Sequence, residues 1–217
     1  MIALCYSGNL RTFAQCVKSH AQVFGPTDVY MSISDQWGYT DKLNDPWHSK
    51  GERMTGEITR SLIESMLPKE FALKRLKITP ASELIFKDRL RKDNHLLYQY
   101  WYMRDCFELI DQDYDFIVRI RPDITIESAK LSFNKIVFSE YVWYNKKYDG
   151  RIMNEMIWIA PPKLMAKSVS ILKNIPEIDK NLPLVGLYGE SVFHEHLRIE
   201  GLLDKKDLFN FNWRVLR

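Results

Sequence analysis

Cysteine is scarce in this sequence, and its few cysteines form no motif. Cys5, Cys16 and Cys106 are odd in number and widely spaced, with no Cys-x-x-Cys pair of the kind that binds zinc or exchanges disulfides. The cysteines therefore give no support for a zinc or redox site. We expect three buried free thiols and a reducing compartment, which is the cytoplasm, or the host cytoplasm if the source is viral.

Long apolar runs are missing as well. No stretch approaches the length that a membrane-spanning helix needs, so we expect a soluble protein with no transmembrane segment. Residues 1–6 are apolar, but they are few, lack a basic start and run straight into Ser-Gly-Asn, which favours a strand over a signal peptide. An excess of one charge is also absent. The net charge is only +3, with basic residues scattered among acids, so no nucleic-acid partner is expected.

Linkers, internal repeats and low-complexity segments are not found either, and residues 1–217 are therefore predicted to form a single domain. The composition is 46% hydrophobic and 13% aromatic, which suffices for a large core and excludes a disordered chain.

The beginning of the chain predicts an α/β fold. Residues 2–6 are an apolar run, Ser7, Gly8 and Asn9 make a tight turn, and apolar side chains then recur at helical spacing up to Phe24. A second apolar run covers residues 29–33. Two strands joined by a helix lie parallel under the right-handed crossover rule, so the turns that follow them share one edge of the sheet. Ligands of open α/β sheets bind at that edge.

Further elements follow from apolar periodicity. Helices are expected to begin near Thr55, at Asp93 or Asn94, at Pro161-Pro162 and near Ser191. Short β-rich runs predict strands at residues 76–79, 84–86, 124–127, 136–143, 156–160 and 208–216. In the helix after Asn94, Gln99 and Arg104 flank a predicted apolar face formed by Leu96, Tyr100, Met103, Phe107 and Ile110.

One strand, residues 114–123, has charged residues where a buried strand ends. Arg119 and Arg121 have the same parity and point to one face, and Asp123 follows Pro122. An arginine fork suits phosphate oxygens, and a nearby aspartate suits a divalent cation on the same phosphates. We expect a nucleotide diphosphate here, although an Arg–Asp bridge with a purely structural role explains the same residues.

Three segments carry a resemblance to a known family. Ser-Gly-Asn-Leu-Arg-Thr-Phe, Asp-Val-Tyr-Met-Ser-Ile-Ser-Asp-Gln-Trp and Tyr-Asp-Phe-Ile-Val-Arg-Ile-Arg-Pro-Asp resemble the nucleotide-sugar half of GT-A glycosyltransferases. Polysaccharide and surface-glycan transferases are the most similar, including the N-terminal domain of a large chlorella-virus glycosyltransferase. The resemblance implies a Rossmann-like mixed, mostly parallel sheet flanked by helices. It also makes residues 1–130 the nucleotide-sugar part and residues 131–217 the acceptor part.

The family's activity is transfer of a sugar, hexosyl or deoxyhexosyl, from a UDP-sugar or related donor to a glycan hydroxyl, with Mn²⁺ or Mg²⁺. Further domains of a longer chain are compatible with it. The nucleoside and phosphates are assigned to Ser7, Gly8, Asn9, Arg11 and Asp35. The diphosphate or donor sugar is assigned to Arg104, Arg119 and Arg121. Asp123 is the predicted metal ligand, with a catalytic role. The family's usual metal motif is Asp-x-Asp, and Arg121 stands at its first position.

An inverting transferase also needs a carboxylate that takes the proton of the acceptor hydroxyl. Glu190, in Gly189-Glu190-Ser191, resembles the family's base, while Asp149 and Glu155 are competitors. Trp37 and Trp47 are candidate platforms for base or sugar rings, and one of the two histidines His194 and His196 is a further candidate for the site. Two other functions stay open: a nucleotide-sugar hydrolase or nucleotidyltransferase, and a sugar- or nucleotide-binding module without turnover.

Overall fold

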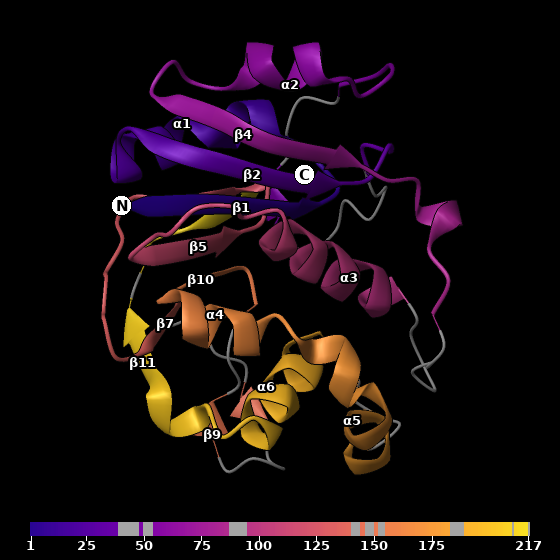
Figure 1. The fold of residues 1–217 in the computed structure, drawn as a ribbon, viewed down its shortest axis with the longest axis vertical. Coiled ribbons are helices and arrows are strands. Elements are labelled where there is room, and N and C mark those ends of the chain that lie inside the picture. The colour runs from indigo at the N-terminus through magenta and orange to yellow at the C-terminus, as the bar shows by residue number, and fades with distance from the viewer. Residues whose placement is uncertain are drawn as a thin grey trace.

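A seven-stranded sheet in the order β11-β7-β10-β5-β1-β2-β4 is the frame of the fold (Figure 1). The structure is a computed structural model that describes residues 1–38, 48–49, 54–86, 95–139, 144–145, 150–151, 155–182, 189–209 and 211–216. The strands of the large sheet are β1 (Ile2–Gly8), β2 (Thr27–Ile33), β4 (Phe71–Ile78), β5 (Phe116–Ile120), β7 (Ile136–Ser139), β10 (Ile157–Ala160) and β11 (Lys206–Phe209).

The sheet is mixed and mostly parallel, as predicted. β1 pairs in parallel with β2 and β5, β2 pairs in parallel with β4, and β11 pairs in parallel with β7. Only β10 runs antiparallel to its neighbours β5 and β7 among the pairs of this sheet. The central strand β5 is buried along its whole length, in agreement with its apolar sequence, which Arg119 interrupts. The carboxyl ends of β1, β2, β4 and β5 therefore meet at one edge.

Helices cover both faces of this sheet (Figure 1). One face carries α3 (His95–Glu108), α4 (Pro162–Ser168), α5 (Ile175–Asn181) and α6 (Gly189–Ile199). The other face carries α1 (Phe13–Phe24), α2 (Arg60–Met66) and a small sheet of β3 (His48–Ser49), β12 (Arg214–Leu216) and β6 (Ile124–Thr125). A separate pair joins β8 (Tyr144–Asn145) to β9 (Gly150–Arg151).

Each face has its own core. Tyr100, Phe138, Trp158 and Phe193 are buried on the α3 side, and burial of each such ring contributes about 1.5–3 kcal/mol to folding. Phe13 and Val17 of α1 belong to the core on the opposite side. The three cysteines are buried and free, as expected. Among the described residues, no helix combines the length and the hydrophobicity that crossing a bilayer requires.

Several predicted boundaries were wrong. The cap of α2 is Thr59, whose side chain accepts a hydrogen bond from the Leu62 amide, and not Thr55. One strand, β4, replaces the two strands predicted at residues 76–79 and 84–86. Because β4 lies at the sheet edge and exposes much of one face, its lysines and arginine interrupt the apolar pattern. The predicted caps Asp93 and Asn94 lie outside the described residues.

Two other differences affect the site. The buried face of α3 consists of Leu97, Tyr100, Met103 and Cys106, so it is rotated from the predicted stripe, and Leu96 lines a cavity instead. Helix α6 begins at Gly189 rather than near Ser191, which puts Glu190 in its first turn. The predicted C-terminal edge strand divides into β11, at the edge of the large sheet, and β12, in the small sheet.

Candidate functional site

A cavity of about 690 Å³ opens at the carboxyl ends of the parallel strands. Its volume lies in the range of roughly 300–1,000 Å³ that small-molecule sites occupy. The residues that line it follow β1, β2 and β4, belong to α3, or lie at the end of β5: Ser7, Gly8, Asn9, Arg11, Ser34, Gln36, Gly38, Ala81, Ser82, Leu96, Tyr98, Gln99, Tyr102, Arg119, Arg121 and Pro122. The predicted edge of the sheet is thus where the cavity lies.

The turn after β1 has an unusual backbone. Gly8 has φ +94° and Arg11 has φ +47°, a region that a side chain other than glycine rarely adopts. The Arg11 amide donates to the Trp37 carbonyl, and Arg11 Nε donates to the Gly38 carbonyl, both at 3.0 Å. At Gly38 a Cβ would collide with the Asn9 side chain. The turns after β1 and β2 therefore hold each other, and they fix the Arg11 guanidinium at the cavity.

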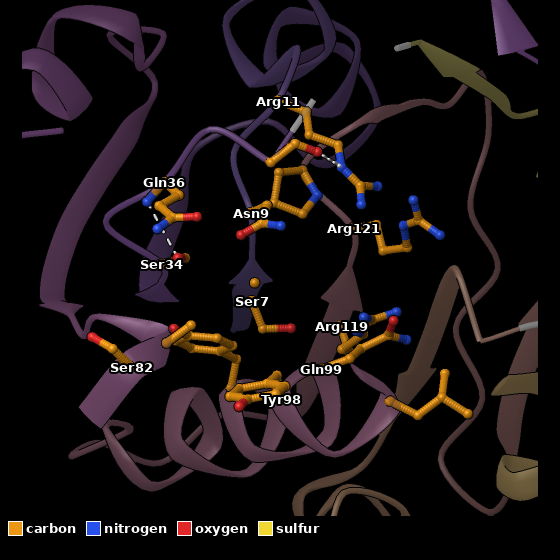
Figure 2. Close-up of a pocket in the computed structure, with 16 residues that line it drawn as sticks. Ser7, Asn9, Arg11, Ser34, Gln36, Ser82, Tyr98, Gln99, Arg119 and Arg121 are labelled. Carbon is orange, nitrogen blue, oxygen red and sulfur yellow. Dashed lines mark hydrogen bonds between the residues drawn. The ribbon is translucent and has the colours of Figure 1, made fainter. Parts of the chain in front are cut away.

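The cavity has a cationic side and a neutral polar side. In Figure 2, Arg11, Arg121 and Arg119 line one side, while Ser34, Gln36 and Ser82 lie on the opposite side. This separation suits a ligand with an anionic group at one end and an uncharged polar group at the other.

Asp123 holds two of these arginines. Its Oδ2 accepts from Arg11 Nη1 and from Arg121 Nη2, both at 2.7 Å, and its Oδ1 accepts from Arg121 Nε at 2.9 Å. The side chain is only 1% exposed. Burial alone raises the pKa of this carboxyl, but the charges of Arg121 and Arg11 outweigh burial and hold the pKa well below its usual range. Asp123 is therefore ionised, and both of its oxygens accept from guanidinium groups.

Arg119 is the most deeply buried of the three arginines, at 1% exposure. Its Nη1 donates to the backbone carbonyls of Glu155 and Met156, and its guanidinium lies 4.9 Å from the Trp158 ring centre. Burial lowers the pKa of Arg119 to about 9, so the group stays charged at neutral pH. Nε and Nη2 of Arg119 find no hydrogen-bond partner among the described residues. Both donors are buried, so a ligand in the cavity reaches them only if neighbouring side chains shift.

Glu155 is a second buried acid next to Arg119. A Cβ at Gly189 would collide with its carboxylate, so the start of α6 approaches Glu155 closely. Burial, followed by the charge of Glu190, raises the pKa of Glu155 from its ordinary 4.5 to about 7. Arg119 and Gln99 lower that pKa, and neither Gln99 Nε2 nor Glu155 Oε2 has a hydrogen-bond partner in the described segments.

Most predicted binding residues come together. Ser7, Gly8, Asn9, Arg11, Arg119 and Arg121 line the cavity. Asp35 is exposed between the lining residues Ser34 and Gln36. Arg104 points elsewhere and pairs with Glu108 at 3.2 Å. Their predicted roles, like those of the other site residues, stay predictions.

Other candidates are distributed differently. Glu190 is half-buried in the first turn of α6, and its charge reaches Arg121. Trp37 packs in the core with its Nε1 donating to the Gly56 carbonyl, so it is no ring platform. His196 is buried between Asn174 and the Lys167 carbonyl, and His194 does not line the cavity. Trp47 and Asp149 lie outside the described residues.

Sequence reasoning missed part of the lining. Tyr98 and Tyr102 of α3, and Ser82 after β4, are not among the predicted site residues, and Gln99 is predicted only to flank the apolar face of the helix. The lining residues of α3 depend on which face of the helix is buried. With the apolar face rotated by one residue, positions 98, 99 and 102 face the edge of the sheet. The signal for Ser82 was the parallel order of β2 and β4, which brings the chain after β4 to the same edge.

The predicted metal does not fit the donor set around Asp123. Mg²⁺ and Mn²⁺ need several oxygen ligands, whereas both Asp123 oxygens already accept from arginines. Over the described part of the chain, no three or more His, Cys, Asp or Glu side chains gather as a metal-binding group.

The fold is shared with solved glycosyltransferase structures. The glycosyltransferase GlyE of Streptococcus pneumoniae TIGR4 has a TM-score of 0.53, covers 96% of this chain and is 10% identical to it. An active-site mutant of LgtC has a TM-score of 0.53, covers 97% of this chain and is 13% identical. This chain spans 45% of the GlyE chain and 73% of the LgtC chain. No protein-family model and no curated protein match the sequence.

These neighbours confirm the predicted α/β, GT-A-like fold. At sequence identities this low, structural similarity shows the fold alone, so the function has to be argued from the residues of the site. The likeness to a chlorella-virus enzyme stays a prediction.

Proposed function

We propose that this protein is a glycosyltransferase that moves a sugar from a nucleoside diphosphate to a glycan hydroxyl. The observation that carries the proposal is the cavity with Arg11, Arg119 and Arg121 on one side, at the carboxyl edge of the parallel strands in a fold shared with glycosyltransferases. Planar guanidinium groups donate paired hydrogen bonds to phosphate oxygens, and the turn after β1 leads into the N-terminal end of α1, where the helix dipole favours an anion.

The two sides of the cavity suggest how the donor lies. The diphosphate contacts the arginines, and the nucleoside lies toward Ser34 and Gln36, whose uncharged groups can hydrogen-bond a base or ribose. Tyr98 and Tyr102 supply aromatic surface on the α3 side. Uridine is the base that the sequence resemblance favours, so UDP-sugars are the first donors to test.

Glu190 is the proposed base of an inverting reaction. The acceptor oxygen attacks C1 of the donor sugar, the bond from C1 to the diphosphate oxygen breaks, and the nucleoside diphosphate leaves with that electron pair. The acceptor proton passes to the Glu190 carboxylate. Glu190 suits this role because it is half-buried at the start of α6, in electrostatic reach of Arg121, whereas Glu155 lies deeper.

A thermal-shift panel of nucleotide sugars tests the proposal. A ligand at 100 times its Kd stabilises the folded state by about 2.7 kcal/mol, which raises the Tm of a chain of this size by roughly 5–11 °C. We expect that shift from UDP and at least one UDP-sugar, and none from the free monosaccharides. Absence of any shift across uridine, guanosine, cytidine and thymidine donors contradicts the proposal.

Product analysis then separates the competing functions. Incubation of the donor with an oligosaccharide panel should give an extended glycan, and Glu190→Gln should lose transfer while it keeps the donor-induced Tm shift. Free sugar as the main product, with or without acceptor, indicates a hydrolase. Donor binding without any product indicates a binding module.

A further inference from the structure

The strongest unassigned feature is the pairing of Asp123, which bears on how this site neutralises a diphosphate. The inference rests on the proposed function, because it concerns the same donor. Three charge-assisted hydrogen bonds of 2.7–2.9 Å link the Asp123 carboxylate to Arg11 and Arg121. The two arginines come from elements far apart in sequence, the turn after β1 and the segment after β5. Asp123 thus gathers guanidinium groups at one place.

This arrangement leaves a divalent cation in an unfavourable position. To coordinate Asp123, the ion would have to displace an Arg11 or Arg121 bond and then lie against both guanidinium charges. Like charges at such short range repel, and the low exposure of the site limits screening by solvent. Among the described residues, no three or more His, Cys, Asp or Glu side chains gather into a group that offsets this repulsion.

The charges already present suit a diphosphate. The group of Arg11, Arg121 and Asp123 carries one net positive charge, and Arg119 adds another. Glu155 and Glu190 offset this in part: the raised pKa of about 7 leaves Glu155 partly protonated at neutral pH, and the charge of Glu190 reaches Arg121. Arg119 lines the cavity as a residue, and its Nε and Nη2 have no partner among the described residues, although both atoms lie just beneath the accessible surface. In Figure 2 the three arginines lie along one side of the cavity, so their charges act on the same ligand.

We propose that Arg11, Arg119 and Arg121 neutralise the donor diphosphate in place of a divalent cation, and that Asp123 is a positioning residue for Arg11 and Arg121 rather than a metal ligand. The donor site is then complete without Mn²⁺ or Mg²⁺. The positive φ of Arg11 is part of the same arrangement, because the strained backbone turns this side chain toward Asp123.

Calorimetric titration of UDP into the wild-type protein, in EDTA and separately in Mn²⁺, tests this proposal without any variant. We expect the Kd in EDTA to lie within about twofold of the Kd in Mn²⁺. Arg11→Gln and Arg121→Gln should each weaken UDP binding by roughly 10–100-fold, equally in both buffers, because each removes a charged donor. Circular dichroism and the Tm without ligand establish that each variant is folded.

Arg75→Gln is the matched control. Arg75 also donates from Nε and Nη2 to one aspartate, Asp111, at 3.0 and 2.6 Å, but this pair is exposed and lies away from the cavity. Its substitution should leave the Kd for UDP unchanged. UDP binding that requires Mn²⁺ would overturn the inference and leave the proposed function standing. Failure to bind UDP or any other nucleoside diphosphate in either buffer would overturn both.

Discussion

Two acids near the cavity are both almost fully buried, yet their surroundings differ. Asp123 is 1% exposed and accepts three hydrogen bonds from two arginines, so its pKa lies well below the usual range. Glu155 is 4% exposed, its Oε2 has no partner among the described residues, and its pKa is raised to about 7. Burial is common to both, so the difference comes from the partners. Asp123 has a fixed charge that organises arginines, whereas Glu155 has a charge that changes near neutral pH.

Removal of the Asp123 carboxylate should have the largest effect on stability. Asp123→Ala leaves Arg11 and Arg121, which are 19% and 11% exposed, without their shared counter-charge. Loss of one partner from a buried ion pair costs about 3–5 kcal/mol, and the lower end is expected here because both arginines border the cavity. We expect a fall of about 3 kcal/mol in the free energy of unfolding by urea. An unchanged free energy of unfolding would mean that the ion pairs of Asp123 with Arg11 and Arg121 do not stabilise the fold.

Glu155→Gln, in contrast to Asp123→Ala, should stabilise the protein, and it should do so only at high pH. Because the folded pKa of Glu155 is raised, its contribution is fully present below pH 4.5 and is lost as pH rises toward 7. The loss is about 3 kcal/mol at most. Glutamine resembles the protonated acid, so the variant should be more stable than the wild type at pH 8 and equally stable at pH 4. Urea unfolding across this range measures the difference, and parallel curves for the two proteins would contradict the raised pKa.

The sequence predicts the position of Asp123 in the fold, but not the partners that distinguish it from Glu155. The strand before Arg121-Pro122-Asp123, the turn after β1 and the shared edge of the sheet follow from apolar runs and from the crossover rule. The structure confirms the parallel pairing of β1 with β2 and shows that β5 also pairs in parallel with β1. The sequence also indicated that Asp123 stands beside arginines. It did not distinguish a ligand-binding acid from a paired one, since that depends on Arg11, more than a hundred positions away.

The surroundings of Glu155 were beyond sequence analysis for a similar reason. Its neighbours Gln99, Arg119 and Gly189 belong to three different elements, and the close approach of α6 is visible only as the space that a Cβ at position 189 lacks. The rotated face of α3 had a local cause. Leu96 and Leu97 are both apolar, so periodicity alone allowed either one to face the core.

The smallest expected effect compares two buried serines that differ in the same way as the two acids. Ser7 lines the cavity and its buried Oγ has no partner among the described residues, whereas Ser168 Oγ donates to the Met165 carbonyl and accepts from Trp158 Nε1. Ser168→Ala should lower the free energy of unfolding by about 1 kcal/mol and leave donor binding unchanged.

Ser7→Ala should leave the free energy of unfolding unchanged and weaken donor binding, since the free protein loses no hydrogen bond while a bound donor loses one. We expect a weakening of roughly threefold to tenfold in the Kd for the UDP-sugar, measured by calorimetry. If Ser7→Ala instead destabilises the free protein as much as Ser168→Ala does, the Ser7 hydroxyl has a structural partner. The polar atoms without partners around the cavity then do not indicate a ligand.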